Sequence, residues 1–230
     1  DRQTLMPPGC RSAHAVTMLQ PGRTVLAGAD LEYLPDFLCP ADADELLAAL
    51  LADVPWQRPV VQIFGRTFRS PRLAAWYGDT GAFYRYSGLV NEPLPWLPSL
   101  AVLRGRIEHR FGQPFNSVLL NLYRDGADSM GWHRDQEPEL GENPTIASIS
   151  LGGIRRFVLQ HSRQADMTRL ELRPEHGSLL LMCGATQHFW RHCVPKTRKV
   201  VAPRVNLTFR RIVLPVAALD VEQHAVVASG

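Results

Sequence analysis

The chain has 230 residues, of which 45% are hydrophobic and 20% are charged, and its formal net charge is +3. These values are ordinary for a globular protein with one well-buried core, and no apolar run approaches the length that crosses a bilayer. We therefore expect a single domain that does not enter the membrane, with a cytoplasmic location. The charge permits an anionic partner but is too small to demonstrate one. The four cysteines show no CxxC spacing, so we expect neither a zinc site nor a disulfide framework.

The first half of the chain begins with turn-forming residues and then contains two helical patterns. Residues 1–24 carry prolines and glycines without apolar periodicity, which predicts a loose tail. Residues 41–54 place leucines at helical spacing behind a run of acidic residues, which favour a helix start. Residues 98–111 also carry an apolar stripe at helical spacing. The sequence therefore predicts two helices in this half.

From residue 117 onwards, short strand-like runs alternate with turn residues. The runs are SVLLNLY (117–123), TIASISL (145–151), RRFVLQ (155–160), TRLELR (168–173), GSLLLMC (177–183) and RVNLTFRRIV (204–213). Many short strands after two helices indicate an α+β, mainly β chain built around an antiparallel sandwich or barrel. No run is followed by a glycine-rich phosphate loop, which argues against a nucleotide-binding α/β enzyme.

The run RVNLTFR has an unusual polar face. Side chains alternate along a strand, so four polar residues share one face: Arg204, Asn206, Thr208 and Arg210. Such a strand is most often amphipathic, with its polar face in water. The rest of the chain decides whether these side chains serve a site instead.

The segment GWHRD supplies candidate metal ligands. His133 and Asp135 are two residues apart and share one face of an extended segment, and QHFWRHCVP offers His188 or His192 as a third ligand. Two histidines and one carboxylate, with the other positions open, form the ligand set of non-haem Fe(II) oxygenases. The arginines of RVNLTFR would then have a use, because a dicarboxylate such as 2-oxoglutarate needs bidentate cationic partners.

Several segments in order resemble the AlkB family of Fe(II)/2-oxoglutarate-dependent dioxygenases, which repair alkylated nucleic acid bases. The segments are NLYRDGADSMGWHRD, ASISLGG followed by RRF, HGSLLLM, FWRHCVPK and APRVNLTFR, within about residues 30–214. The resemblance implies a double-stranded β-helix (jelly-roll) core with flanking N-terminal helices and a nucleotide-recognition lid at about 56–90. We expect one domain over 25–214 and a C-terminal tail over 215–230.

The resemblance also assigns roles to individual residues. The metal ligands would be His133, Asp135 and His192, and His188 is left out. Arg204 would bind the distal carboxylate of 2-oxoglutarate, while Arg210 would lie near its metal-end carboxylate and belong to the catalytic set. The full group that binds the cosubstrate would be Asn121, Tyr123, Arg204, Asn206 and Arg210.

The expected lid interleaves arginines with aromatic residues, as suits phosphate contact combined with base stacking. A β-hairpin with core aromatics and solvated arginines is the plainer interpretation. By resemblance, Phe64 would be an apolar wedge that fills the gap left by a flipped base, and Tyr86 and His133 would sandwich that base. The substrate contacts would be Phe64, Arg72, Tyr84, Tyr86 and Glu137.

The implied activity is oxidative demethylation of 1-methyladenine and 3-methylcytosine in DNA, with RNA left open. It would use Fe(II), O2 and 2-oxoglutarate and release succinate, CO2 and formaldehyde. Three alternatives remain: an Fe(II)/2-oxoglutarate hydroxylase of a non-nucleic-acid substrate, a silent nucleic-acid-binding module, and a cupin-like zinc or manganese protein. The second would show a broken ligand set, and the third leaves the arginines of RVNLTFR unused. No heptad or large apolar stripe appears, so we expect a monomer.

Overall fold

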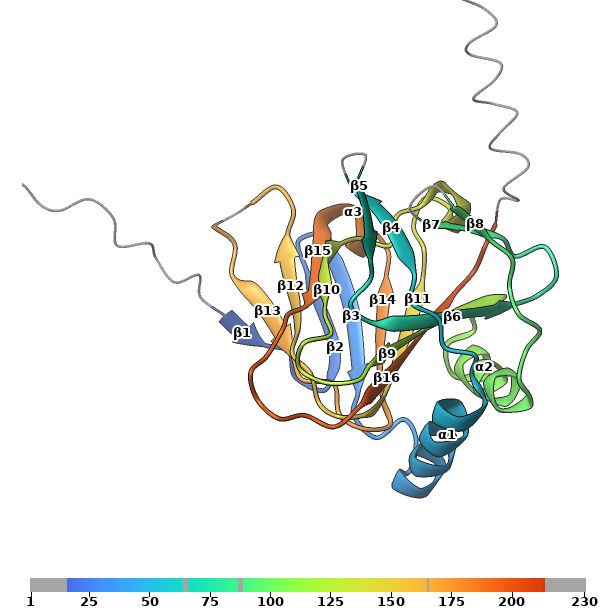
Figure 1. Cartoon of the computed structure of the whole chain (residues 1–230). Coiled ribbons are helices and arrows are strands. Elements are labelled where there is room, and N and C mark those ends of the chain that lie inside the picture. Colours follow the sequence, from blue (N-terminus) through green and yellow to red (C-terminus); the bar gives the residue numbers. More distant parts are fainter. Residues whose placement is uncertain (1–15, 64–65, 87–88, 165, 214–230) are drawn as a thin grey trace, which may run out of the picture.

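The structure is a computed structural model that describes residues 16–63, 66–86, 89–164 and 166–213. Two β-sheets form its centre (Figure 1). The larger has the order β2-β3-β14-β11-β16-β9-β6 and the smaller the order β1-β13-β12-β15-β10. No helix among the described residues is long and apolar enough to cross a membrane.

The strands have the following bounds. Those of the larger sheet are β2 (Gly22–Leu26), β3 (Ala29–Leu34), β6 (Leu73–Gly78), β9 (Ser117–Tyr123), β11 (Ile146–Gly152), β14 (Ser178–Cys183) and β16 (Arg204–Arg210). Those of the smaller sheet are β1 (Val16–Met18), β10 (Met130–His133), β12 (Phe157–His161), β13 (Arg169–Leu172) and β15 (Trp190–Val194). Two hairpins stand apart, formed by β4 (Val60–Ile63) with β5 (Arg66–Arg69) and by β7 (Tyr84–Tyr86) with β8 (Leu89–Asn91).

Both predicted helices are confirmed. Helix α1 spans Pro40–Asp53, and its first turn is capped by Cys39, whose Sγ accepts a hydrogen bond from the Asp42 N–H at 3.4 Å. Helix α2 spans Pro98–Phe111 and ends at Gly112, whose φ of 64° lies in the left-handed region that favours glycine. A short helix α3 (Thr186–Phe189) and a 3₁₀ turn η1 (Pro138–Leu140) complete the helical elements of the described residues.

The larger sheet is buried on both faces, because one face packs on the helices and the other on the smaller sheet. Helices α1 and α2 lie beside one end of β16 and β9 (Figure 1), and their apolar residues form a core with the outward residues of the sheet. A second core fills the space between the sheets. Every residue of β16 is therefore buried. A mainly β, two-sheet jelly-roll with helices outside it is the fold that the sequence predicts.

The prediction of a loose tail over residues 1–24 is wrong for its last part. β1 pairs in parallel with β13, and β2 pairs with β3, so residues 16–18 and 22–24 belong to the sheets. The strands also do not all follow the helices, since β3 precedes α1 and pairs with β14. These pairings join segments far apart in the chain, and a local pattern carries no information about such partners. The expected lid range, 56–90, contains the two hairpins except for Asn91, the last residue of β8, although residues 64–65 and 87–88 lie outside the described residues.

Candidate metal and cosubstrate site

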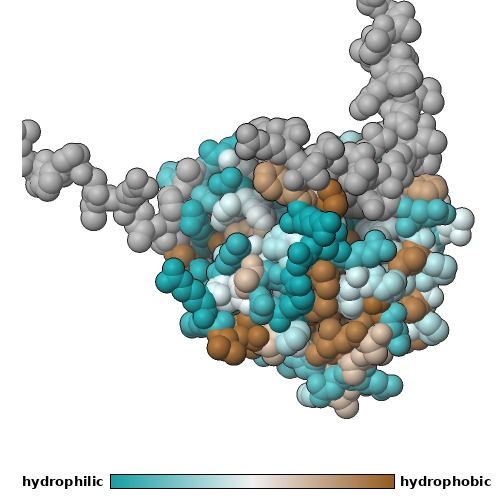
Figure 2. Space-filling model, in the orientation of Figure 1, coloured by the Kyte–Doolittle hydropathy of each residue, from teal (hydrophilic) through white to brown (hydrophobic). Residues whose placement is uncertain are grey.

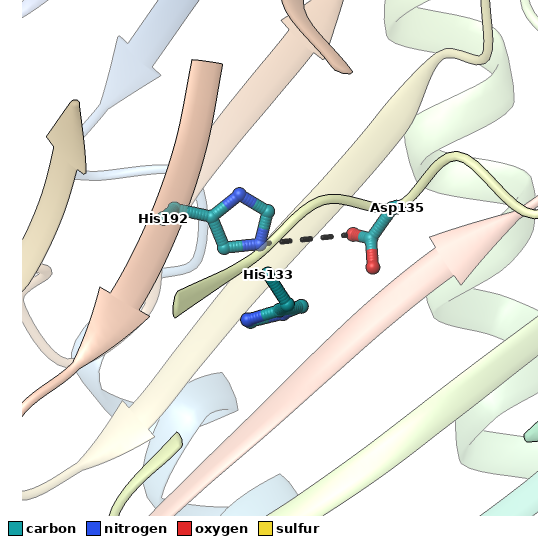
Figure 3. A group of neighbouring side chains, drawn as sticks. All are labelled: His133, Asp135 and His192. Carbon is teal, nitrogen blue, oxygen red and sulfur yellow. Dashed lines mark ion pairs between the residues drawn. The ribbon is translucent and has the colours of Figure 1, made fainter. Parts of the chain in front are cut away.

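Three predicted metal ligands converge at the edge of the smaller sheet (Figure 3). His133 ends β10 and pairs with His192 of β15 in the strand register, and Asp135 follows two residues later. One potential ligand atom from each side chain lies within 4.8 Å of the other two. The Asp135 Oδ2 and His192 Nε2 atoms are 3.9 Å apart. One divalent cation could be held by all three groups, and this donor set suits Fe(II).

The surroundings keep the two imidazoles neutral and the carboxylate charged, as metal ligation requires. Burial, followed by the neighbouring His133, lowers the pKa of His192 to about 3. Burial also lowers the pKa of His133. For Asp135, burial raises the pKa, but the charge of Arg210 and then the two histidines outweigh this effect, so its pKa is lowered. The site is therefore prepared for a cation at neutral pH.

Hydrogen bonds orient each side of this group. The His133 Nδ1 lies 2.9 Å from the Gly131 carbonyl and, when protonated, donates to it, which leaves Nε2 available for a metal. An Arg210 N–H donates to Asp135 Oδ1 at 2.8 Å. The Asp135 backbone N–H donates to Oε1 of Gln187, a fully buried residue of α3, at 3.0 Å. Sequence reasoning missed Gln187, because only the folded chain brings α3 beside Asp135.

The polar face of RVNLTFR points into the space between the sheets. Asn206, Thr208 and Arg210 line one cavity together with the three candidate ligands. Arg204, farther along the same face, is 2% exposed, donates to the Ser150 hydroxyl at 2.8 Å, and lies over the Tyr123 ring at 5.3 Å. The face is therefore not solvated.

Arg204 has unused hydrogen-bonding capacity. Its Nε and one terminal nitrogen are buried and have no hydrogen-bond partner among the described residues, and burial lowers its pKa. Burying a guanidinium without full pairing lowers the stability of the fold, which indicates that a bound anion pairs with the free N–H groups of Arg204. A carboxylate of 2-oxoglutarate fits this requirement, because it accepts two parallel N–H bonds from one guanidinium.

Two serines of β11, Ser148 and Ser150, accept hydrogen bonds from side chains on the same face, and neither was among the predicted site residues. Asn206 donates to the Ser148 hydroxyl and to the Ile149 carbonyl, both at 2.8 Å. In the register of β11 and β16, Ser150 is opposite Asn206 and Ser148 is opposite Thr208. The alternation of serine and apolar residues in ASISL was the available signal.

The predicted substrate contacts are only partly described. Arg72 is buried and donates to the Asn121 amide oxygen at 2.6 Å and to the Ser70 hydroxyl at 3.1 Å, so it borders the cosubstrate residues. Glu137 is half-buried and follows Asp135 by two residues. Phe64 lies outside the described residues, as do the side chains of Tyr84 and Tyr86, whose backbones form β7.

His188 is not part of the ligand group and makes hydrogen bonds elsewhere. Its Nε2 bonds to the Glu142 carbonyl, and its own carbonyl accepts a hydrogen bond from Arg134 at 2.7 Å. Of the two histidines that the residues alone left open, His192 is the one that the structure places beside His133 and Asp135.

Comparisons with known proteins identify the family of the chain. The 2OG-Fe(II) oxygenase superfamily matches residues 30–210. The DNA oxidative demethylase ALKBH2 of Bos taurus is 44% identical over 202 residues, which cover 83% of this chain and 72% of the relative. The human protein named alpha-ketoglutarate-dependent dioxygenase alkB homolog 3 is 44% identical over 77% of this chain and 64% of its own length.

Solved structures support the fold. The structure of OsALKBH1 aligns with a TM-score of 0.57 at 16% identity and covers 82% of this chain and 99% of that one. A 2OG-Fe(II) oxygenase family oxidoreductase from Burkholderia pseudomallei aligns with a TM-score of 0.52 at 17% identity, covering 78% of this chain and 84% of that one. With the ligand group, the buried arginines and the sequence matches taken together, the chain belongs to the 2OG-Fe(II) oxygenase superfamily and, within it, to the AlkB family of dioxygenases that use Fe(II), 2-oxoglutarate and O2.

Proposed function

We propose that this protein demethylates 1-methyladenine and 3-methylcytosine in DNA as a repair enzyme, and that RNA is a further substrate. The observation that carries the proposal is the cavity between the sheets, where the His133, Asp135 and His192 group lies beside the buried Arg210 of β16, with the buried Arg204 farther along the same strand face. The relatives at 44% identity include a protein named DNA oxidative demethylase. A monomer is sufficient, because all of these residues belong to one chain.

The chemistry of the bound groups is that of the family. When bound, Fe(II), O2 and 2-oxoglutarate supply an oxidation that yields succinate and CO2 and inserts one oxygen atom into an N-methyl C–H bond; the hydroxymethyl product then loses formaldehyde and restores the base. The reaction uses both oxygen atoms of O2: one enters succinate, and the other becomes the hydroxyl group on the methyl carbon.

The residues of the chain would bind and orient the reactants. His133, Asp135 and His192 would hold the metal, and Arg204 would fix the distal carboxylate of 2-oxoglutarate with help from Tyr123 and the supporting Asn206. Asn121 would add a neutral contact from β9. Arg210 would hold the Asp135 carboxylate in place while lying close to the metal-end carboxylate of the cosubstrate.

The hairpins and the segment after β10 would receive the nucleic acid. Arg72 borders both the cosubstrate residues and a neighbouring surface cavity lined by Gln57, Trp76 and Glu92, among others, so it would separate substrate from cosubstrate. The proposed role of Glu137 is a hydrogen bond to the edge of the flipped base. The proposed roles of Phe64 as wedge, and of Tyr84 and Tyr86 as base contacts, remain predictions.

Mass spectrometry of a short DNA containing one 3-methylcytosine tests the function. The protein is incubated aerobically with Fe(II), ascorbate and 2-oxoglutarate, and the DNA is supplied as single strand and as duplex. We expect the methyl group to be lost only when 2-oxoglutarate is present. The Asp135→Ala variant should lose this activity, whereas Asp42→Ala, which removes an exposed carboxylate of α1, should retain it.

Two outcomes would contradict the proposal in different ways. Full methyl removal by Asp135→Ala would overturn the metal assignment. Conversion of 2-oxoglutarate to succinate without loss of the methyl group would retain the oxygenase chemistry and indicate a hydroxylase of another substrate.

A further inference from the structure

The outer face of the smaller sheet carries an aromatic and basic cluster that the proposed chemistry does not use. Trp132 and Arg191 precede the metal ligands His133 and His192 in the sequence. Neighbouring residues of a strand point to opposite faces, so these two side chains lie on the outside of the same two strands that hold the metal ligands. Strand β10, which carries Trp132, is at the edge of the sheet (Figure 1).

The Trp132 side chain is 39% exposed and is contacted by two guanidinium groups. The guanidinium carbon of Arg191 lies 5.1 Å from the centre of the ring, and that of Arg169, on β13, lies 5.8 Å from it. The Nε atoms of both arginines are buried and have no hydrogen-bond partner among the described residues, and a terminal N–H of Arg191 donates to the Gln160 side-chain oxygen at 3.3 Å. A partly exposed aromatic ring thus lies beside two positive charges.

Further positive charge surrounds this group. Glu171, on β13, is contacted by Arg156 at 2.6 Å and by Arg173 at 3.5 Å, and both arginine side chains are more than half exposed. Two guanidinium groups therefore share the Glu171 carboxylate, and those of Arg169 and Arg191 lie at the Trp132 ring. Figure 2 shows a mainly hydrophilic surface on the left of the molecule, where Figure 1 places β12, β13 and β15.

We propose that this surface, the Trp132 cluster of Trp132, Arg169 and Arg191 with Arg156 and Arg173, binds the nucleotides that flank the target base of a single-stranded nucleic acid. The inference rests on the proposed function. Excess positive charge attracts phosphates, and an exposed ring beside guanidinium planes offers stacking to any base. An acidic peptide would match the charge but would leave the ring unused. The cluster lies on the reverse side of the strands that hold the metal ligands, so a strand that enters the cavity with one base can pass the β10 edge with its neighbours.

Binding of single strands of two lengths tests the inference. Fluorescence anisotropy is measured without oxygen, with Fe(II) and 2-oxoglutarate present, for a trinucleotide with a central 3-methylcytosine and for an oligonucleotide of about 15 residues with the same centre. The Arg169→Gln/Arg191→Gln variant should bind the longer strand about tenfold more weakly, and its slope of log affinity against log salt should fall by about 1.4, for two lost phosphate contacts. Its demethylation of the trinucleotide should equal that of the wild type.

Matched variants distinguish a specific effect of the Trp132 cluster from a general effect of lost positive charge and from loss of stability. The Arg106→Gln/Arg110→Gln variant neutralises two exposed arginines of α2 and should bind both strands like the wild type. Arg173→Ala removes a side chain that is 59% exposed and should fold normally, with about threefold weaker binding of the longer strand.

The results that would overturn the inference are distinct from failure of the proposed function. Unchanged affinity of the cluster variants for the longer strand would overturn it, as would an equal loss in the α2 variant. Binding of poly-glutamate that the cluster variants lose, with strand affinity unchanged, would assign the surface to an acidic protein instead. Failure of the wild type to demethylate either strand would reject the proposed function, while the anisotropy would still report on the cluster.

Discussion

At the scale of single residues, the site combines groups whose charges are set by burial. His192 is 4% exposed and packs edge-on against His133, with ring centres 4.2 Å apart. Two protonated imidazoles at this distance would repel each other and would also lose hydration. Both imidazoles therefore stay neutral and can bind a metal. Keeping them neutral lowers the free energy of unfolding in acid, so the stability of the fold depends on pH.

The stability of the metal-free protein should fall in mild acid. In the unfolded chain, His192 titrates near 6.5, whereas in the folded chain its pKa is about 3. Between these values the unfolded state binds more protons, so stability rises with pH across the window and is level above it. At pH 5, His192 alone should cost about 2 kcal/mol relative to neutral pH.

Urea unfolding of the chelator-treated protein at acid and neutral pH measures this effect. The His192→Gln variant should show a flatter dependence on pH, and His109→Gln, at an exposed position of α2, should keep the wild-type slope. An unchanged slope in His192→Gln would show that His192 titrates normally in the fold.

Arg204→Lys should weaken cosubstrate binding selectively. A lysine keeps the charge but has no planar fork for a carboxylate, and it loses the bond to Ser150 and the contact with Tyr123. We expect the KM for 2-oxoglutarate to rise about tenfold to a hundredfold, from the loss of charge-assisted bonds. Titration of 2-oxoglutarate at saturating iron measures this, with exposed Arg110→Lys as the control. An unchanged KM would contradict the proposal that Arg204 binds a carboxylate of 2-oxoglutarate.

At the scale of elements, β11 and β16 form the rigid base of the cosubstrate site. Gly152 ends β11 opposite Arg204 in the register, with a φ of 80°. An added Cβ would lie 2.4 Å from the Pro203 carbonyl oxygen, next to Arg204 in the chain. The glycine is thus required for the close approach of the two strand ends, and the position of Arg204 depends on it.

Gly152→Ala should therefore affect both stability and binding. The left-handed conformation and the backbone clash should cost about 1–3 kcal/mol of unfolding free energy, and the displaced Arg204 should raise the KM for 2-oxoglutarate. Gly105→Ala is the matched control, because α2 leaves open space at that position and alanine favours a helix by about 0.5–1 kcal/mol. Urea unfolding measures the change in stability, and titration of 2-oxoglutarate measures the change in KM. A Gly152→Ala protein as stable as Gly105→Ala would refute the steric account.

At the scale of the whole molecule, the proposed site joins the two sheets. His133 and His192 come from the smaller sheet, whereas Arg204 and Arg210 come from the larger one. A metal and a dicarboxylate bound between them would link the layers through charged contacts. Binding should therefore stabilise the fold as a unit.

Ligands should accordingly raise the melting temperature in a cooperative way. At a hundredfold excess over Kd, one ligand stabilises the folded state by about 2.7 kcal/mol, which corresponds to about 5–10 °C for a chain of this size. Mn(II) with 2-oxoglutarate should raise Tm by more than the sum of the two added separately. The His192→Gln variant should lose the joint effect. Equal, additive shifts would show that the two ligands do not share a site.

The sequence by itself determined the secondary elements that have clear periods and the candidate metal-ligand group. The helices over 40–53 and 98–111, the alternation in RVNLTFR, and the ligand pattern in GWHRD and RHCVP are local, and the ordered motifs identified the family. What only the tertiary structure decided depends on contacts between distant segments. These are the sheet partners of β1 and β2, Gln187 behind Asp135, and the burial of both faces of β16. Periodicity reports which face of a strand is polar, whereas the layer packed against that face, and hence whether it meets water or a bound dianion, is set by the fold of the entire chain.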